Sequence, residues 1–170
     1  MSNVTAKFVP NLTLTQTPST GFLAGQTLSI PELLSLVLTN GTGSDQINLI
    51  ACTTLSLAGA TQTLDLTSMT DAQGAAVNFA KVRFVLIKNN ATTDGYTCLV
   101  GGNGSNPWTG FLNTAGKLTV FPGSAANPAG GFAILSAPNT TAGAVSGSSK
   151  ILLFDPSSNT FTVDVILCGA

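Results

Sequence analysis

The stretch Thr160-Phe161-Thr162-Val163-Asp164-Val165-Ile166-Leu167 alternates polar and apolar residues over most of its length. Side chains of a β-strand point alternately to opposite faces, so a two-residue period is typical of a strand with one buried face. Phe161, Val163, Val165 and Leu167 would face a core, while Thr160, Thr162 and Asp164 would face solvent. This stretch therefore predicts a half-buried strand.

Similar strand signals recur along the whole chain. The two-residue period appears in three further segments, which are Leu12–Thr15, Leu55–Leu57 and Thr63–Thr67. A second class of segment is apolar at consecutive positions, as in Ile47–Cys52, Val82–Ile87, Phe132–Leu135 and Ile151–Phe154. Such segments are typical of central strands, or of strands that a neighbour covers on the outer face. Two more segments, Tyr96–Val100 and Leu118–Phe121, complete the expected set.

Turn-forming residues separate these segments. Clusters of Gly, Pro, Asn and Asp occur at Asn40–Gly43, Asp71–Gly74, Asn89–Gly95, Gly101–Asn106, Pro122–Gly123 and Asp155–Asn159. About ten short strands at such spacing favour a sandwich or barrel over a parallel sheet with crossover helices. We expect an all-β chain with a single antiparallel β-sandwich, or jelly-roll-like, domain over residues 12–170. Residues 1–11 are expected to form an extended N-terminal arm.

One segment could be helical. Ser29-Ile30-Pro31-Glu32 fits a capping box, and Leu33, Leu34, Val37 and Leu38 then recur at helical spacing. This pattern favours one short helix of two turns, the only helix expected. A strand over Ser35–Thr39 is the alternative.

The composition is unusually poor in charge. Only 8% of residues are charged, whereas about 25% is usual for a soluble domain. Charged side chains normally keep soluble molecules apart. Two explanations stand: much of the surface is buried against other copies, which we favour, or the protein works where neutral polar surfaces are tolerated.

The basic residues argue against nucleic acid as a partner. The net charge is −1, and only Lys81, Arg83 and Lys88 lie near one another in the sequence. Lys81 and Arg83 would share one face of a strand, which predicts a solvated edge rather than a phosphate site. A membrane surface would require a basic face that is also missing. We therefore expect neither a direct nucleic-acid contact nor a membrane contact.

The residues that most enzymes need are scarce. There is no histidine, so the common nucleophile systems and the commonest metal ligand are absent. Asp65, Asp71 and Asp94 are carboxylates whose strand or turn positions explain them without catalysis. The three cysteines, Cys52, Cys98 and Cys168, are widely spaced and predict buried free thiols rather than disulfides or a zinc site. We expect no enzyme activity, no cofactor and no metal.

The only tryptophan lies in a polar, glycine-rich segment, Gly101–Gly110. Exposing an indole is unfavourable, so Trp108 could fold back and close the end of the sandwich. Alternatively, Trp108 and its neighbours Asn106, Pro107 and Phe111 could contact another subunit or stack on a ligand such as a sugar ring. These four residues are the candidate interface or ligand-binding site.

Residues 80–170 resemble small β-sandwich virion proteins of bacteriophages, associated with the capsid or the tail. The resemblance is carried by the order Val82–Asn89, Val100-Gly101-Gly102, the Trp108 loop, Leu118–Gly123, Ile151–Asp155 and Thr162–Gly169. These motifs mark strands and turns, so no functional residue is carried over from the family.

The resemblance implies a jelly-roll-like sandwich that assembles symmetrically, alone and with other virion proteins. It therefore predicts a capsid or capsid-decorating protein, located in the virion after assembly in the host cytoplasm. Met1–Pro10 lacks the apolar core of a secretory signal, which agrees with release by host lysis. The alternative is a module of a phage tail or cell surface that binds a receptor or a glycan.

Overall fold

The fold was determined as a computed structural model, which describes residues 5–8, 36–71, 73–102, 104–113, 115–126, 131–139 and 142–170. All regular elements in these ranges are strands, and none of these residues is helical. The strands are β1 Ala6–Phe8, β2 Leu36–Asn40, β3 Gln46–Ile47, β4 Leu49–Ala58, β5 Gln62–Asp65, β6 Met69–Thr70, β7 Ala76–Val77, β8 Val82–Asn89, β9 Cys98–Gly101, β10 Lys117–Val120, β11 Phe132–Ser136, β12 Ile151–Asp155 and β13 Thr160–Gly169.

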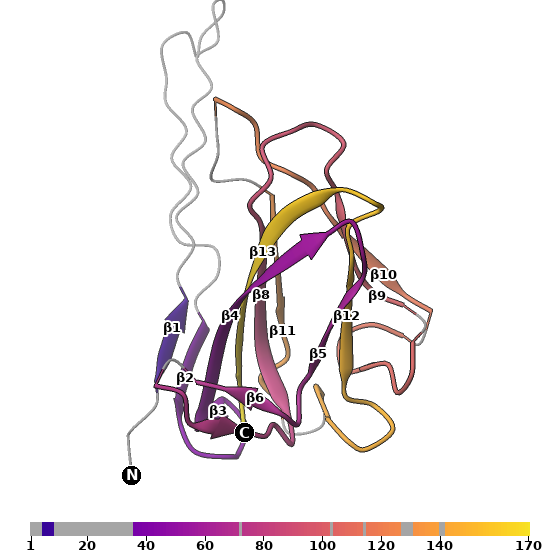
Figure 1. The fold of residues 1–170 in the computed structure, drawn as a ribbon. Coiled ribbons are helices and arrows are strands. Elements are labelled where there is room, and N and C mark those ends of the chain that lie inside the picture. The colour runs from indigo at the N-terminus through magenta and orange to yellow at the C-terminus, as the bar shows by residue number, and fades with distance from the viewer. Residues whose placement is uncertain are drawn as a thin grey trace, which may run out of the picture.

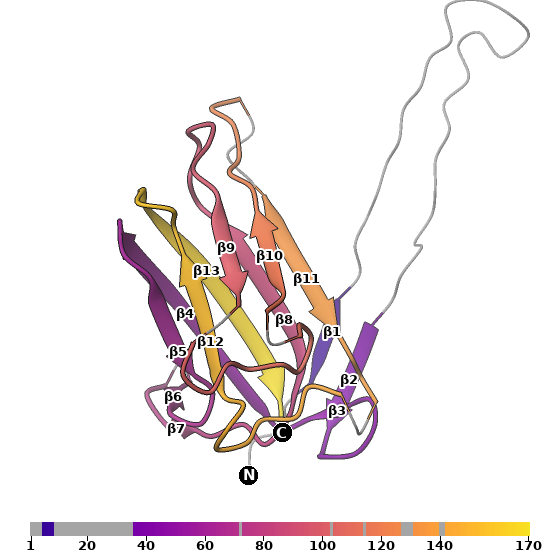
Figure 2. The same cartoon turned by 90° about the vertical axis from the view of Figure 1, so that its right-hand side faces the viewer.

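Two antiparallel sheets form the body of the molecule. The β13 sheet has the order β11-β8-β13-β4, and the β12 sheet has the order β10-β9-β12-β5. The two sheets lie face to face, with β4 and β5 at one side and β10 and β11 at the other (Figures 1 and 2). The predicted all-β sandwich class is confirmed.

Strand β13 explains why the alternating stretch decides the fold. It lies between β4 and β8 and pairs with β4 from Thr160↔Ala58 to Gly169↔Leu49. Phe161, Val163, Val165 and Leu167 are buried, as the two-residue period predicts. Each such side chain contributes about 1.5–3 kcal/mol by leaving water.

One continuous core fills the space between the sheets. The β13 sheet supplies residues such as Val85, Ile87 and Val163, and the β12 sheet supplies Val100 and Phe154. All five side chains are almost completely buried. Because this core needs both sheets, neither could remain folded with its inner face in water.

Strand β8 is apolar on both faces because each face meets a different partner. Its inner side chains enter the main core, while Phe84 and Leu86 belong to a second apolar cluster on the outer face of the β13 sheet. A small sheet of order β1-β2-β3 supplies Leu38 and Ile47 to that cluster. The prediction that such a strand is central or covered by a neighbour is thus explained for β8.

The helix prediction is wrong where it can be compared. Residues Leu36–Asn40 form strand β2, paired with β1 on one side and β3 on the other, as the alternative strand over Ser35–Thr39 anticipated. Pairing partners and the burial of Leu38 override the local helical spacing. The capping box at Ser29–Glu32 and the strand expected at Leu12–Thr15 lie outside the described residues. Within the expected arm of residues 1–11, Ala6–Phe8 form β1, and most of the remainder also lies outside the described ranges.

Arg83 corrects the prediction of a solvated basic edge. Its side chain is fully buried, because two loops meet over this end of β8. The Asp45 amide donates to the Pro138 carbonyl and joins these loops. The guanidinium makes long hydrogen bonds of 3.4 Å to the Gly43 carbonyl and 3.5 Å to the Ala142 carbonyl. Desolvation lowers the pKa of Arg83 from its usual value.

Candidate interaction surface

The Trp108 segment is fastened to the sandwich. Trp108 is only 4% exposed and belongs to the main core. Its indole Nε1 donates a 2.9 Å hydrogen bond to the Ala144 carbonyl, and its ring packs edge-on against Phe111 at 5.2 Å and 90°. The Trp108 amide also donates to the Ile151 carbonyl at the start of β12. The indole therefore acts as a packing element in this chain.

The other three candidate residues retain some access to solvent. Asn106 is exposed, while Pro107 and Phe111 are half-buried. The Asn106 carbonyl accepts hydrogen bonds from the amides of Lys150 and Ile151, which holds the segment against β12. The structure thus gathers the four residues at one end of β12. A subunit or ligand contact there stays a prediction, and it falls to Asn106, Pro107 and Phe111 rather than to the indole.

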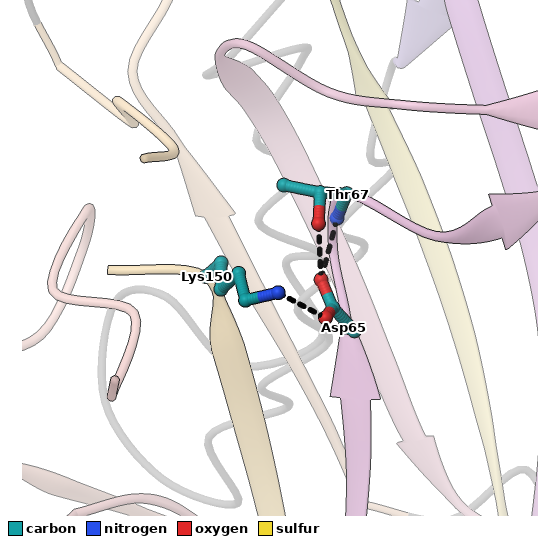
Figure 3. Close-up of polar contacts among 3 residues, drawn as sticks. All are labelled: Asp65, Thr67 and Lys150. Atoms are coloured by element: carbon teal, nitrogen blue, oxygen red, sulfur yellow. Dashed lines mark hydrogen bonds and ion pairs between the residues drawn. The ribbon is translucent and has the colours of Figure 1, made fainter. Parts of the chain in front are cut away.

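Asp65, Thr67 and Lys150 form a polar cluster beside β5 (Figure 3). Lys150 Nζ lies 2.6 Å from Asp65 Oδ2, and the amide and hydroxyl of Thr67 donate to Asp65 Oδ1 at 2.9 and 2.6 Å. These contacts, above all the hydrogen bond from Lys150, lower the pKa of Asp65 to about 2. An acid held ionised in this way is a structural clamp rather than a group ready to exchange a proton at neutral pH.

Replacing Asp65 with asparagine tests the clamp. We expect Asp65→Asn to lower the free energy of unfolding by about 1 kcal/mol at pH 7, the upper range for a partly exposed ion pair. Because the folded-state pKa is depressed, this stabilisation is present above pH 3.8 and is lost as the pH falls towards 2. In urea unfolding measured from pH 7 to pH 2, the free energies of unfolding of wild type and Asp65→Asn should therefore become equal at low pH.

Asp94→Asn is the control, because Asp94 lies in an exposed turn and bonds only the neighbouring Gly95 amide. A constant difference between wild type and Asp65→Asn from pH 7 to pH 2 would contradict the clamp.

A polar hollow of about 470 Å³ lies next to this clamp. Its lining is rich in hydroxyl groups and consists of Thr53, Thr63, Leu64, Asp65, Ser68, Met69 and Thr70. Hydroxyls and a carboxylate can exchange hydrogen bonds with a polyhydroxylated ligand. No aromatic ring is among these lining residues, so stacking of a sugar ring has no platform in the hollow.

The outer face of the β13 sheet carries an apolar row across all four strands. Cross-strand partners place Ile134 of β11 beside Leu86 of β8, Leu86 beside Ile166 of β13, and Ile166 beside Cys52 of β4. Ile134, Leu86 and Ile166 are half-buried and Cys52 is exposed. We call these four residues the outer row. The adjacent row, which includes Phe84 and Cys168, is buried beneath the small β1-β2-β3 sheet.

A groove of about 250 Å³ marks the border between the covered and uncovered parts of this face. Seven of its lining side chains are apolar, and Lys7 is the single charged one; the lining is Lys7, Leu36, Leu38, Ile50, Phe84, Leu86, Ile166 and Cys168. The small sheet therefore leaves apolar surface of the β13 sheet in contact with water.

Strand β11 is the open edge of the same sheet. It pairs with β8 on one side and has no strand partner among the described residues on the other. Its first residue, Phe132, is 63% exposed. A comparably exposed ring, Phe121 at 64%, follows β10 in the β12 sheet. Exposed large apolar side chains at a sheet edge are typical of a contact with another protein surface.

The exposure of the cysteines agrees with the covered and uncovered rows on the outer face of the β13 sheet. Cys98 and Cys168 are buried free thiols, and burial raises their pKa values to about 12 and about 11. Cys52 corrects the expectation of three buried thiols, because its outward side chain in β4 is exposed. The β1-β2-β3 sheet covers the row of Cys168, while the row of Cys52 stays open.

Sequence reasoning named none of the residues in this surface as a site. The available signal was the segment Phe132–Leu135, apolar at consecutive positions although β11 is an edge strand. Such a pattern is typical of a strand that is covered on both faces, and the described residues cover the outer face of β11 only in part.

Comparisons with known proteins do not identify a relative of this chain. No protein-family model matches the chain, and neither curated proteins nor solved structures give a significant match. The described residues contain no helix that is long and apolar enough to cross a membrane. Nor do His, Cys, Asp and Glu side chains gather anywhere in these ranges into a group of three that could hold a metal ion. The described part of the chain is an all-β sandwich with a partly apolar outer sheet face.

Proposed function

We propose that this chain is a structural subunit of a viral particle, a capsid or capsid-decorating protein of a bacteriophage that acts through symmetric self-assembly. The observation that carries the proposal is the partly uncovered apolar face of the β13 sheet, formed by the outer row and the open edge at β11. An isolated soluble domain usually shields such a face or separates its copies with charge.

Two further observations support the proposal. Only 8% of the residues are charged, with six basic and seven acidic side chains, so repulsion between copies is weak. The sequence also resembles phage virion proteins over residues 80–170, in the order of its strands and turns. A non-enzymatic role agrees with the absence of histidine and with the ionised, clamped state of Asp65.

Light scattering coupled to size-exclusion chromatography tests self-assembly. At micromolar concentration we expect one discrete species with a mass several times the 17.2 kDa of the chain, and symmetric particles in negative-stain micrographs. Because the contact is apolar, 1 M salt should not dissociate it. A monomer under these conditions would contradict the proposal.

The second candidate function is a module that binds a receptor or a glycan. The hydroxyl-lined hollow beside Asp65 favours it, because polar side chains there can bond to sugar hydroxyl groups. A glycan array with the purified chain distinguishes the two functions. Binding to one class of glycan that Thr63→Val removes would favour the module, whereas an array without signal would leave assembly as the function.

A further inference from the structure

We propose that strand β11 pairs antiparallel with β11 of a second copy across a two-fold axis, so that two β13 sheets become one continuous sheet. The inference rests on the proposed self-assembly, and it names the surface through which two copies of the chain bind each other. It assigns the centre of that contact to Ile134, with Phe132 and Ser136 on either side.

The backbone groups of β11 that have no hydrogen-bond partner among the described residues define which residues can pair. The Asn89 amide donates to the Gly131 carbonyl, and the Ala137 amide donates to the Arg83 carbonyl. Antiparallel strands alternate between hydrogen-bonded and non-bonded residue pairs. The bonds towards β8 therefore belong to the odd-numbered residues, and the N–H and C=O groups of Phe132, Ile134 and Ser136 point away from β8, towards the open edge.

This edge lacks the features that normally prevent strand addition. Protected edges carry charged side chains, proline or a bulge. Phe132-Ala133-Ile134-Leu135-Ser136 contains neither charge nor proline, and its register with β8 is regular throughout. By contrast, β10 at the same side of the sandwich exposes Lys117, which protects the edge of the β12 sheet.

A two-fold axis at Ile134 satisfies all of these free groups at once. Ile134 would exchange two hydrogen bonds with Ile134 of the partner subunit. The same symmetry sets Phe132 opposite the partner's Ser136, and Ser136 opposite the partner's Phe132. Two copies of β11 can thus pair in a single register in which each of these backbone groups has a partner.

The outer row argues for a second copy rather than another protein. Ile134 lies at the end of this row, so the two-fold axis joins the rows of both copies into one apolar band. Charge does not select a different partner, because Lys88 and Asp164 are paired neighbours on this face and the strand itself is neutral. A surface that matches itself in shape, polarity and hydrogen-bond pattern defines an isologous contact.

Charge placed at the axis tests the contact. Ile134→Lys puts two ammonium groups opposite each other, and we expect the mass from light scattering to fall at least twofold. Gln62→Lys is the control, since Gln62 is exposed on β5, which lies at the opposite side of the sandwich from β11 (Figure 2). It should leave the mass unchanged. Circular dichroism and the Tm of Ile134→Lys check that the monomer is folded.

A cross-link tests the register independently of any loss of assembly. Cα atoms of a directly opposed, hydrogen-bonded antiparallel pair lie about 5.5 Å apart, within the range that a disulfide spans. In a Cys52→Ser background, which removes the exposed native thiol, Ile134→Cys should form a covalent dimer on mild oxidation. Gln62→Cys in the same background should stay monomeric on a non-reducing gel.

The outcomes separate this inference from the proposed function. A wild-type oligomer with unchanged mass in Ile134→Lys and no cross-link in Ile134→Cys would overturn the β11 contact and leave self-assembly intact. A monomeric wild type would overturn both. A fall in mass for Ile134→Lys together with the covalent dimer supports the β11 contact.

Discussion

Asn89→Asp is expected to lower the free energy of unfolding by about 3–5 kcal/mol, a large part of the stability of a domain this size. Asn89 is 0% exposed, and its amide nitrogen donates to the Tyr96 carbonyl at 2.7 Å and to the Val120 carbonyl at 3.1 Å. Its Oδ1 accepts from the Ala91 amide at 2.9 Å. An ionised aspartate would lose both donors and place a buried negative charge against two carbonyl oxygens.

Urea unfolding at pH 7 and pH 4 measures the effect. Burial would raise the pKa of the introduced carboxyl above its unfolded value, so the deficit is largest above the folded-state pKa and shrinks as the pH falls through it. Asn113→Asp is the control, because Asn113 is exposed and only accepts a hydrogen bond, from the Ala115 amide at 3.2 Å. Equal losses in the two variants would show that the buried bonds of Asn89 are unimportant.

Gly143→Ala is expected to have a comparable effect, about 3–5 kcal/mol or failure to fold. Gly143 has φ of +72°, and a Cβ added there would lie 1.7 Å from the Val82 carbonyl oxygen. The left-handed conformation alone costs an alanine about 1–2 kcal/mol. The overlap with backbone cannot be relieved by rotating a side chain, so the hydrogen bond from the Val82 amide to the Gly143 carbonyl must also distort.

The matched control is Gly74→Ala. Gly74 also has a positive φ, +84°, but nothing lies within 4 Å of an added Cβ. Thermal unfolding should therefore show a loss of about 1 kcal/mol for this variant, from conformation alone. If Gly143→Ala were no worse than Gly74→Ala, the close approach to Val82 would not be a real constraint.

The alternation of polar and apolar residues predicted strands whose buried face follows from the pattern of their own side chains. The period in Thr160–Leu167 led to the correct buried face of β13, because a strand between two others must point one face at the core. The segment Val82–Ile87 was predicted to be a central strand or a strand that a neighbour covers, and β8 lies between two strands and meets a second apolar cluster on its outer face.

Features that depend on distant partners escaped prediction. Val37 and Leu38 belong to a helical spacing that begins at Leu33, but pairing with β1 and β3 makes Leu36–Asn40 a strand. Arg83 is charged and was expected at the surface, yet loops 40 and 59 residues away in sequence supply its hydrogen-bond acceptors. The residues around Arg83 in the sequence do not indicate which distant loops will pack over β8.

The candidate site also combines features that local sequence predicts with features that depend on distant residues. The sequence drew attention to Trp108 as the only tryptophan, but the Ala144 carbonyl that accepts a hydrogen bond from its indole lies 36 residues away. Conversely, Phe132 and Ile134 looked like ordinary core residues. Their importance comes from the position of β11 at the edge of its sheet, which is a property of topology.

The place of β13 in its sheet has a consequence for synthesis of the chain on the ribosome. Strands β4 and β8 share no hydrogen-bonded register, and β13, which is translated after both, lies between them. A nascent chain therefore holds two strands with open apolar edges until β13 emerges from the exit tunnel. Chaperone protection during that interval would matter more for this topology than for one in which sequential strands are neighbours.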